Sequence, residues 1–378
     1  MVTERVKRAL PDDVKCFLIE PMSRDDHAIH DLLSGRRRGV LPGATRAALG
    51  LIEPLYAHVM RVRNAMYDRN TLRARALGRP TVSVGNLTTG GTGKTPVVAW
   101  LAGELLLSGR RPGVLMRGYK GRDGASDEAD ELRSRLGPVV PVQVDSDRSR
   151  GAKALLARWP EVNVFLLDDA HQHRRAGRDF DLVLIDATNP FGFDHVLPRG
   201  LLREPVDGGL RRASAVLLTK VDQTDESAVG AIRRRVESTV PGLAVFKSSH
   251  DLIRLRGHPG GWHETSWLKG RSISAFCGIG NPLSFRRLLE RAGAQVVGWN
   301  AFTDHHRYTQ TEIDRLYQSA DMSGAEILVT TAKDAARLHS LSFDRSRLRV
   351  TEVGVKFLPG DDQRLLERIV RAIGRQPV

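Results

Sequence analysis

Cysteine is scarce in this chain of 378 residues, which contains only Cys16 and Cys277. The two lie far apart and no CxxC motif exists, so neither a disulfide framework nor a cysteine zinc site is indicated. The sequence also lacks a secretion signal, because Met1–Lys15 carries many charges and no apolar run. No stretch reaches the roughly 18–20 uninterrupted apolar residues of a membrane-spanning helix. We therefore expect a protein of the reducing cytoplasm that is soluble or lies on a membrane surface.

Internal repeats and low-complexity tracts are absent as well. Hydrophobic residues make up 41% of the chain, which is enough for substantial buried cores and argues against disorder. The length suggests two domains, at roughly 100–200 residues each. The net charge of +14 favours an anionic partner, such as nucleic acid, an acidic membrane or a phosphorylated substrate. Because arginine is spread along the whole chain, we expect no nucleic-acid partner, and no obligate protein partner is evident.

Two segments precede the regular part of the sequence. Residues 1–35 are polar and charged without a clear period, and we predict a variable extension. Residues 36–78 begin with three arginines, Arg36–Arg38, and continue with the apolar segment Ala47–Met66. The spacing of Leu51, Leu55, Val59 and Val62 predicts a helix, which Pro54 starts or interrupts. Flanking basic residues suit a helix on anionic lipid, whereas packing on its own domain is the alternative that the residues alone favour.

From Pro80 onwards, short apolar runs alternate with helical segments. Such a pattern predicts a parallel sheet covered by helices on both faces. Strands are expected at Thr81–Gly85, Pro112–Met116, Asn163–Leu167, Leu182–Ile185 and Ala215–Leu218. Residues 243–270 hold several glycines and are predicted to be a linker. A second α/β lobe is expected in residues 271–378, with strands at Ser272–Cys277 and Glu326–Val329 and helices at Leu283–Ala292 and Arg364–Ile373.

A glycine-rich loop joins the first predicted strand to the helix that ends near Leu107. It consists of Thr88, Thr89, Gly90, Gly91, Thr92, Gly93, Lys94 and Thr95. Glycines let backbone N–H groups approach phosphate oxygens, and the helix N-terminus adds positive potential. Lys94 would reach the β- and γ-phosphates, and the Thr95 hydroxyl would bind Mg²⁺. Thr88 stands where the strict motif has glycine. We predict that residues 79–242 form a P-loop nucleotide-binding core, in an α/β fold of the P-loop NTPase type.

Acidic residues follow two of the predicted strands. Asp168 and Asp169 come after the run Val164–Leu167, and Asp186 follows Leu182–Ile185. Ligands gather at the carboxyl ends of parallel strands, so either position could supply a carboxylate to Mg²⁺. The nearby His171 and His173 lack the cysteines of a zinc site.

A second nucleotide motif is incomplete. The segment Thr219-Lys220-Val221-Asp222 resembles the guanine-reading NKxD of GTPases, with threonine in place of asparagine, but the Asp186 segment does not read DxxG. A P-loop ATPase or GTPase that acts as a switch or assembly protein, without a lipid substrate, is therefore the alternative to a kinase.

Further segments occur in a specific order. They are Ser83–Asn86 before the loop, Arg117–Tyr119, Asp168-Asp169 with Gln172–Arg174, Leu197–Pro205, Gly278–Pro282, Phe302–His306 and Thr330–Asp334. In order and spacing this set resembles the tetraacyldisaccharide 4'-kinase (lipid A 4'-kinase) family, from about residue 33 to near the C-terminus.

The resemblance implies two α/β/α lobes joined by a short ribbon, with the active site between them. It implies ATP and Mg²⁺, and transfer of the γ-phosphate to the 4'-hydroxyl of an acylated glucosamine disaccharide 1-phosphate in lipid A biosynthesis. It further implies work at the cytoplasmic face of the bacterial inner membrane. Residues 36–78 then become a membrane-surface region with an amphipathic helix, in contact with an anionic bilayer.

The resemblance also assigns roles to residues. Asp127 matches a catalytic aspartate and His305 matches its partner histidine in the second lobe, a pair that could accept the proton of a sugar hydroxyl. Lobe closure would bring them together. Asp168 and Asp169 match the metal-binding pair. The predicted substrate residues are Glu128, His173, Arg203 and Glu204.

Three features depart from the family pattern. Ala170 and His171 replace Gly-Phe after the aspartate pair, Ser126 replaces the glycine before Asp127, and the stretch from Tyr119 to Asp127 is shorter. Asp123 and Asp130 remain alternative bases.

Overall fold

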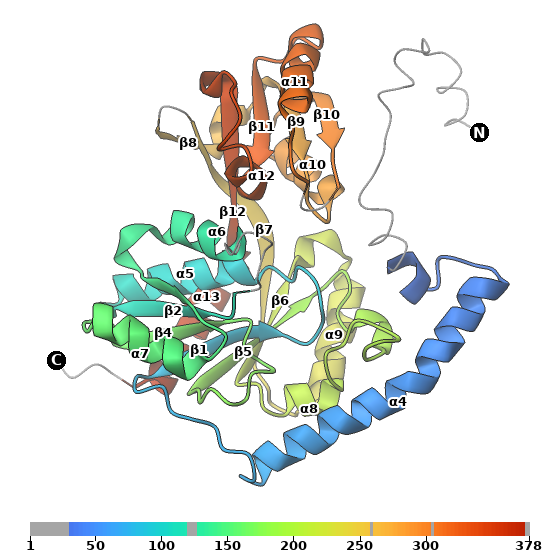
Figure 1. Cartoon of the computed structure of the whole chain (residues 1–378), viewed down its shortest axis with the longest axis vertical. Coiled ribbons are helices and arrows are strands. Elements are labelled where there is room, and N and C mark those ends of the chain that lie inside the picture. The colour runs from blue at the N-terminus through green and yellow to red at the C-terminus, as the bar shows by residue number, and fades with distance from the viewer. Residues whose placement is uncertain (1–29, 119–126, 258–259, 304–305, 375–378) are drawn as a thin grey trace. The chain divides into compact units, whose positions relative to one another are not determined.

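The computed structural model describes residues 30–118, 127–257, 260–303 and 306–374, apart from the side chains of Asp127 and Glu128. These residues form two compact units, a larger one of Asp31–Asp251 with Val353–Val378 and a smaller one made mostly of Leu252–Glu352 (Figure 1). The chain passes from the larger unit to the smaller within β7 (Val245–Arg256) and returns within β12 (Leu348–Phe357).

The larger unit is built on a parallel sheet with the strand order β3-β2-β4-β1-β5-β6-β7. The strands are β1 (Thr81–Asn86), β2 (Pro112–Met116), β3 (Val142–Val144), β4 (Val164–Asp168), β5 (Phe180–Asp186) and β6 (Ala215–Thr219). All residues of β1, β2, β4 and β6 are buried. A strand buried on both faces needs apolar side chains on both, which explains why these strands could be predicted as continuous apolar runs.

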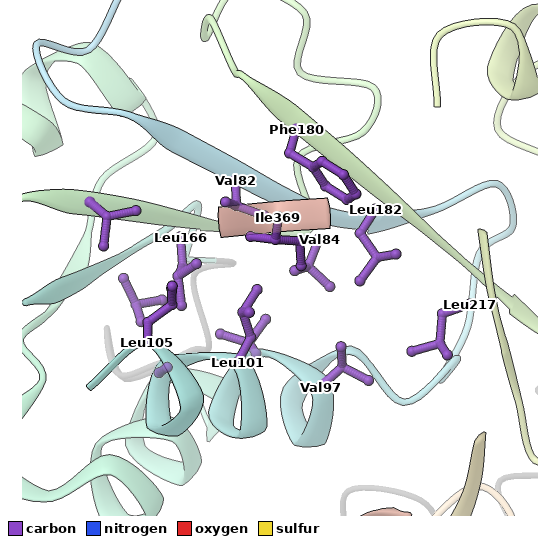
Figure 2. Packing of buried hydrophobic residues seen from close by; sticks show 14 of the residues in the cluster. Val82, Val84, Val97, Leu101, Leu105, Leu166, Phe180, Leu182, Leu217 and Ile369 are labelled. Atoms are coloured by element: carbon purple, nitrogen blue, oxygen red, sulfur yellow. The ribbon is translucent and has the colours of Figure 1, made fainter. Parts of the chain in front are cut away.

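Helices cover both faces of this sheet (Figure 1), which confirms the predicted α/β fold. One face packs against α5 (Lys94–Leu107), α6 (Asp127–Leu136) and α13 (Asp361–Ala372). Figure 2 shows this face, where Leu101 of α5 and Ile369 of α13 lie among the sheet's valines and leucines. The other face packs against α7 (Arg148–Arg158), α8 (Val206–Leu210) and α9 (Glu226–Thr239). Side chains alternate between the faces along each strand, as Leu166 and Leu167 of β4 do.

The N-terminal helix α4 (Val40–Asp68) has 29 residues and contains Pro54. Its inner side contributes Ala57 to the apolar cluster that includes Val206 and Leu210 of α8. The stripe that predicted the helix faces solvent instead, because the exposed fractions of its members Leu51, Leu55, Val59 and Val62 are 83%, 67%, 54% and 45%. Packing of this stripe on its own domain, the alternative weighed from sequence, is therefore not found among the described residues. None of the described helices combines the length and apolarity that crossing a bilayer requires.

The smaller unit has its own parallel sheet, with the order β10-β9-β11-β12. It comprises β9 (Ser272–Cys277), β10 (Gln295–Ala301), β11 (Ile327–Thr331) and the first half of β12, with α10 (Pro282–Arg291), α11 (Gln310–Met322) and α12 (Ala332–Ala336). The short strand β8 (Trp262–Glu264) pairs antiparallel with the end of β7. Phe276, Ile313 and Leu328 belong to the buried core of the smaller unit.

The units divide at other positions than the predicted domain boundaries. The predicted linker 243–270 contains the twelve-residue strand β7. The last helix of the predicted C-terminal lobe 271–378, α13, belongs to the larger unit. Leu365 and Ile369 of α13 are fully buried in the core of the larger unit, and the Lys247 N–H of β7 donates to the Asp361 carboxylate (2.8 Å). The amphipathic face of α13 predicted a helix correctly, but it contained no information on which sheet the helix covers.

Candidate active site

The glycine-rich loop lies between β1 and α5, at the carboxyl end of the sheet. Gly90 and Gly93 have φ angles of 112° and 84°, a region that glycine adopts without strain. Thr88 forms an antiparallel bridge with Leu202, and the Thr89 N–H donates to the Leu201 carbonyl (2.8 Å). The backbone at Thr88 is thus part of a β-bridge, so the glycine of the strict motif is not required there. Lys94 and Thr95 are the first residues of α5, as a phosphate-binding loop requires.

Asp169 links the loop lysine to an arginine. Its Oδ1 lies 3.6 Å from Lys94 Nζ and accepts a hydrogen bond from Arg203 (2.9 Å). Burial would raise the pKa of Asp169, but Lys94 and Arg203 outweigh it and lower the pKa below the usual range. Asp169 is therefore ionised, and it adopts a positive φ of 48° that is unusual for a residue other than glycine. The structure brings together three of the predicted site residues: Lys94, Asp169 and Arg203.

Asp168 and Thr95 were predicted to bind Mg²⁺, and both belong to elements next to the phosphate-binding loop. Asp168 is the last residue of β4 and pairs in register with Val84 of β1, the strand that leads into the loop. Mg²⁺ keeps several waters and takes one or two carboxylates plus phosphate oxygens, so it needs no cage of protein ligands. The described residues contain no group of three or more His, Cys, Asp or Glu side chains that could hold a metal ion. The oxygen donors of Asp168, Asp169 and Thr95 fit Mg²⁺ on these terms.

The competing aspartate, Asp186, is already engaged. One carboxylate oxygen forms an ion pair with Lys220, and the other accepts from the backbone N–H and the hydroxyl of Thr188 (2.9 and 2.7 Å). Asp186 thus pairs with Lys220, whereas Asp169 is the carboxylate that lies 3.6 Å from the loop lysine Lys94.

Glu204 was predicted to be a substrate residue, but its side chain is fully buried. Its carboxylate accepts hydrogen bonds from Asn64 (2.8 Å), Gln172 (3.0 Å) and Arg212. Burial would raise the pKa of Glu204, and Arg212 outweighs this and lowers it. A buried carboxylate with three donors holds its neighbours in place, and among them Gln172 also contacts Arg203 (3.4 Å).

His171, one of the departures from the family pattern, is fully buried beneath the same segment. Its Nδ1 lies 3.0 Å from Asp181 Oδ2, and Arg178 contacts the same oxygen (3.2 Å). Burial would raise the pKa of Asp181, but His171 and Arg178 outweigh it and lower the pKa to about 2. There is no room beside this histidine for a larger residue at Gly85, whose added Cβ would lie 2.6 Å from the Cβ of His171. His171 therefore adds a buried contact to the Arg178–Asp181 ion pair, close in sequence to Asp168 and Asp169.

The inner side of α4 contacts the same region. The Tyr56 hydroxyl donates to the Arg203 carbonyl (3.0 Å), and Arg63 donates to the Gln172 carbonyl (2.8 Å). With the bond from Asn64 to Glu204, three side chains of this helix hold residues next to Asp169. Sequence reasoning missed this role, because the helix could be recognised only by its apolar stripe, and Arg63 was interpreted as a basic flank of that stripe.

Several predicted residues are less informative in the structure. Asp127 begins α6, but its side chain and that of Glu128 lie outside the described residues, as do Asp123 and His305. Asp130 is exposed and pairs with Arg133 (2.9 Å). His173 is partly buried, and burial together with Arg148 and Arg178 lowers its pKa to about 4, so that it is neutral at pH 7.

Comparisons with known proteins give a consistent result. The tetraacyldisaccharide-1-P 4'-kinase family model matches residues 45–374. The tetraacyldisaccharide 4'-kinase of Anaeromyxobacter sp. (strain Fw109-5) is 37% identical over 88% of this chain and 93% of its own length. That of Syntrophus aciditrophicus (strain SB) is 38% identical over 79% and 86%. Among solved structures, LpxK from Aquifex aeolicus in complex with ATP matches with a TM-score of 0.69 and 28% identity, over 87% of this chain and 100% of that one.

Proposed function

The chain belongs to the tetraacyldisaccharide-1-P 4'-kinase family, and we propose that the site around Lys94, Asp169 and Arg203 performs this reaction. The protein is an ATP-dependent kinase of lipid A biosynthesis, and its substrate is a lipid-linked disaccharide phosphate. The observation that carries the proposal is the phosphate-binding loop whose lysine and Arg203 share the same Asp169 oxygen, within a family match that spans both units. A switch or assembly ATPase is not favoured, since the relatives are kinases.

The loop residues Thr88–Thr95 would bind the triphosphate of ATP through backbone N–H groups, and Lys94 would neutralise the β- and γ-phosphates. Asp168, Asp169 and Thr95 would hold Mg²⁺, which supplies charge neutralisation at the phosphates when bound. Asp169 contacts both Lys94 and Arg203, and these two positive charges would stabilise the transferred phosphate. We assign Arg203 and His173 to the substrate side, with Glu204 acting through Gln172, which contacts Arg203.

The acceptor is the 4'-hydroxyl of an acylated glucosamine disaccharide 1-phosphate in this proposal. We propose Asp127 as the base that accepts the hydroxyl proton, His305 as its partner and Glu128 as a substrate residue, from their match to the family motifs. A sugar hydroxyl is a weak nucleophile, so a positioned base would accelerate the transfer by about 10²–10⁴-fold.

We further propose that α4 attaches the enzyme to the cytoplasmic face of an anionic inner membrane. The exposed stripe Leu51, Leu55, Val59 and Val62 supports this, because it presents a continuous apolar face to solvent. The exposed Arg36–Arg38 at the start of the helix would add attraction to anionic headgroups.

The test is a transfer assay with labelled ATP, Mg²⁺ and a disaccharide monophosphate lipid in mixed micelles. A labelled bisphosphate lipid is expected from the native protein. The variant Lys94→Ala should form none while its circular dichroism spectrum stays unchanged, and Asp127→Ala should lose about 10²–10⁴-fold in kcat. Release of inorganic phosphate without a labelled lipid would overturn the proposal. A negligible loss in Asp127→Ala would reassign the base to Asp123 or Asp130.

A further inference from the structure

The segment that resembles NKxD has no role in the site as described so far. Thr219 is the last residue of β6, which lies beside β5 in the sheet, and its side chain is fully buried. Its Oγ1 donates to the carbonyl of Thr92 (3.0 Å). The next residue, Lys220, donates from Nζ to the carbonyl of Gly91 (3.0 Å). Two consecutive carbonyls of the phosphate-binding loop are thus held by two consecutive side chains.

The Lys220 side chain is fixed in this position. It is 15% exposed and forms an ion pair with Asp186, whose other carboxylate oxygen is bonded to Thr188. The backbone of Lys220 has a φ of 56°, which costs free energy in a residue other than glycine and persists only where the surroundings impose it. A flexible lysine held at both ends in this way presents its ammonium group at one place.

A third contact comes from β7. An added Cβ on Gly93 would lie 2.3 Å from His250 Nε2, so the imidazole packs directly against the loop. Residues 91, 92 and 93 of the loop are therefore contacted by Lys220 and Thr219 at the end of β6 and by His250 within β7.

Fixing a carbonyl fixes the neighbouring N–H, because the trans peptide unit is planar and its N–H points opposite to its C=O. The bond from Thr219 to the Thr92 carbonyl therefore directs the Gly93 N–H away from β6. Phosphate-binding loops depend on such preset N–H directions, since the groups then need no reorientation when the anion binds.

We propose that Thr219 and Lys220 are positioning residues that preset the backbone of the phosphate-binding loop for any nucleoside triphosphate, rather than residues that read the nucleobase. This inference rests on the proposed nucleotide donor site. Their donor groups are used on the loop carbonyls, so they act on the triphosphate, which all nucleotides share. The predicted consequence is weaker nucleotide binding by the same factor for every base when either side chain is lost.

The experiment compares Thr219→Val and Lys220→Met, which keep the side-chain volume but remove the donor. Equilibrium dialysis with Mg²⁺ gives the Kd of ATP and of GTP, and the transfer assay gives KM for nucleotide and for lipid. We expect the nucleotide Kd and KM to rise about 2–10-fold in Thr219→Val and about 10–100-fold in Lys220→Met, as for loss of a neutral and a charged hydrogen bond. The ratio of the ATP and GTP constants and the KM for lipid should stay constant.

The matched control is Thr351→Val, because Thr351 is also buried and donates its hydroxyl to a backbone carbonyl, that of Thr330 in the smaller unit (3.0 Å). The variant Thr351→Val should leave the nucleotide Kd unchanged. The variant Thr219→Ser keeps the hydroxyl and should have the nucleotide Kd of the native protein. Unchanged nucleotide constants in both test variants would overturn the inference, as would a changed ATP to GTP ratio or an equal loss in Thr219→Ser. Should the native protein bind ATP but transfer no phosphate to lipid, the proposed function would fail while dialysis still decides the role of these two residues.

Discussion

The exposed stripe of α4 allows a quantitative prediction for membrane binding. Burying a leucine side chain completely is worth about 1.5–3 kcal/mol. Leu51 and Leu55 are 83% and 67% exposed, so their transfer into the interfacial region of a bilayer would contribute about 2–4 kcal/mol together. The double variant Leu51→Ser/Leu55→Ser should therefore bind vesicles about 30–1,000-fold more weakly, at about tenfold per 1.4 kcal/mol. Its stability should change little, because both side chains are on the surface.

The assay is sedimentation with sucrose-loaded vesicles that contain about one third anionic lipid, at two salt concentrations. Raising the salt should weaken binding further, because Arg36–Arg38 interact with the anionic headgroups and this attraction is screened. Activity towards a water-soluble, short-chain acceptor should be preserved, since both leucines face solvent.

A matched control exists on the same unit. Leu107 and Val139 are 84% and 67% exposed, almost the same as Leu51 and Leu55, but they lie at the end of α5 and after α6. The variant Leu107→Ser/Val139→Ser loses similar apolar surface away from α4 and should keep the native vesicle affinity. If both double variants bind equally well, or if both lose affinity to the same degree, the stripe is not the membrane-binding surface.

Three further predictions concern the interior of the larger unit. Glu204→Ala removes the buried acceptor of Asn64, Gln172 and Arg212, and should destabilise the protein by about 3–5 kcal/mol, seen as a lower midpoint in urea unfolding. Asp169→Asn removes the charge that orients Lys94 and Arg203, and stopped-flow measurements should show a lower kcat with little change in stability. The free energy of unfolding should fall as the pH is lowered from about 6.5 to about 4, because His173 and His250 have pKa values of about 4 when folded and about 6.5 when unfolded. A constant free energy of unfolding across this range would contradict the assignment of both as neutral.

The sign of that pH effect follows from proton counts. Between pH 4 and 6.5 the unfolded chain binds protons at these two histidines and the folded chain does not, so acid favours unfolding. Burial is the main cause of the lowered pKa for both, and nearby cations add to it: Arg148 and Arg178 for His173, and Lys220 for His250. Substituting His250 with asparagine should reduce the slope of stability against pH over this range.

The sheet of the larger unit could be predicted because its strands are buried on both faces and therefore read as unbroken apolar runs. The ends of β2, Pro112 and Met116, were placed correctly for this reason. The strands β10 and β12 escaped prediction. The residues of β10 are only partly buried or exposed, those of β12 mix buried with partly exposed positions, and the two strands contain Trp299, Asn300 and Arg349. Half-buried strands of mixed composition lack the pattern that distinguishes a strand from a loop.

The candidate site could be predicted only in part. Lys94 and Asp169, which the structure brings together, could be predicted because each belongs to a local motif that fixes its neighbours in sequence. Asn64 and Tyr56 were missed, because their function depends on contacts with residues about 140 positions away, which no local pattern encodes. For Glu204 the position was recognised but not its burial, since a charged residue in a motif suggests contact with a ligand rather than a structural role.

The proposed membrane attachment gives the two sides of α4 separate tasks. Its outer side presents the stripe of Leu51 and Leu55, and its inner side holds Arg203 and Glu204 through Tyr56 and Asn64. A lipid-linked acceptor carries its acyl chains in the bilayer, so its sugar can be reached only close to the membrane surface. A single rigid helix that binds lipid on one side and supports the arginine of the site on the other would fix the height of that arginine above the bilayer. Asn64→Leu should therefore impair transfer to the membrane-bound acceptor while leaving vesicle binding intact, which separates the inner role of the helix from the outer one.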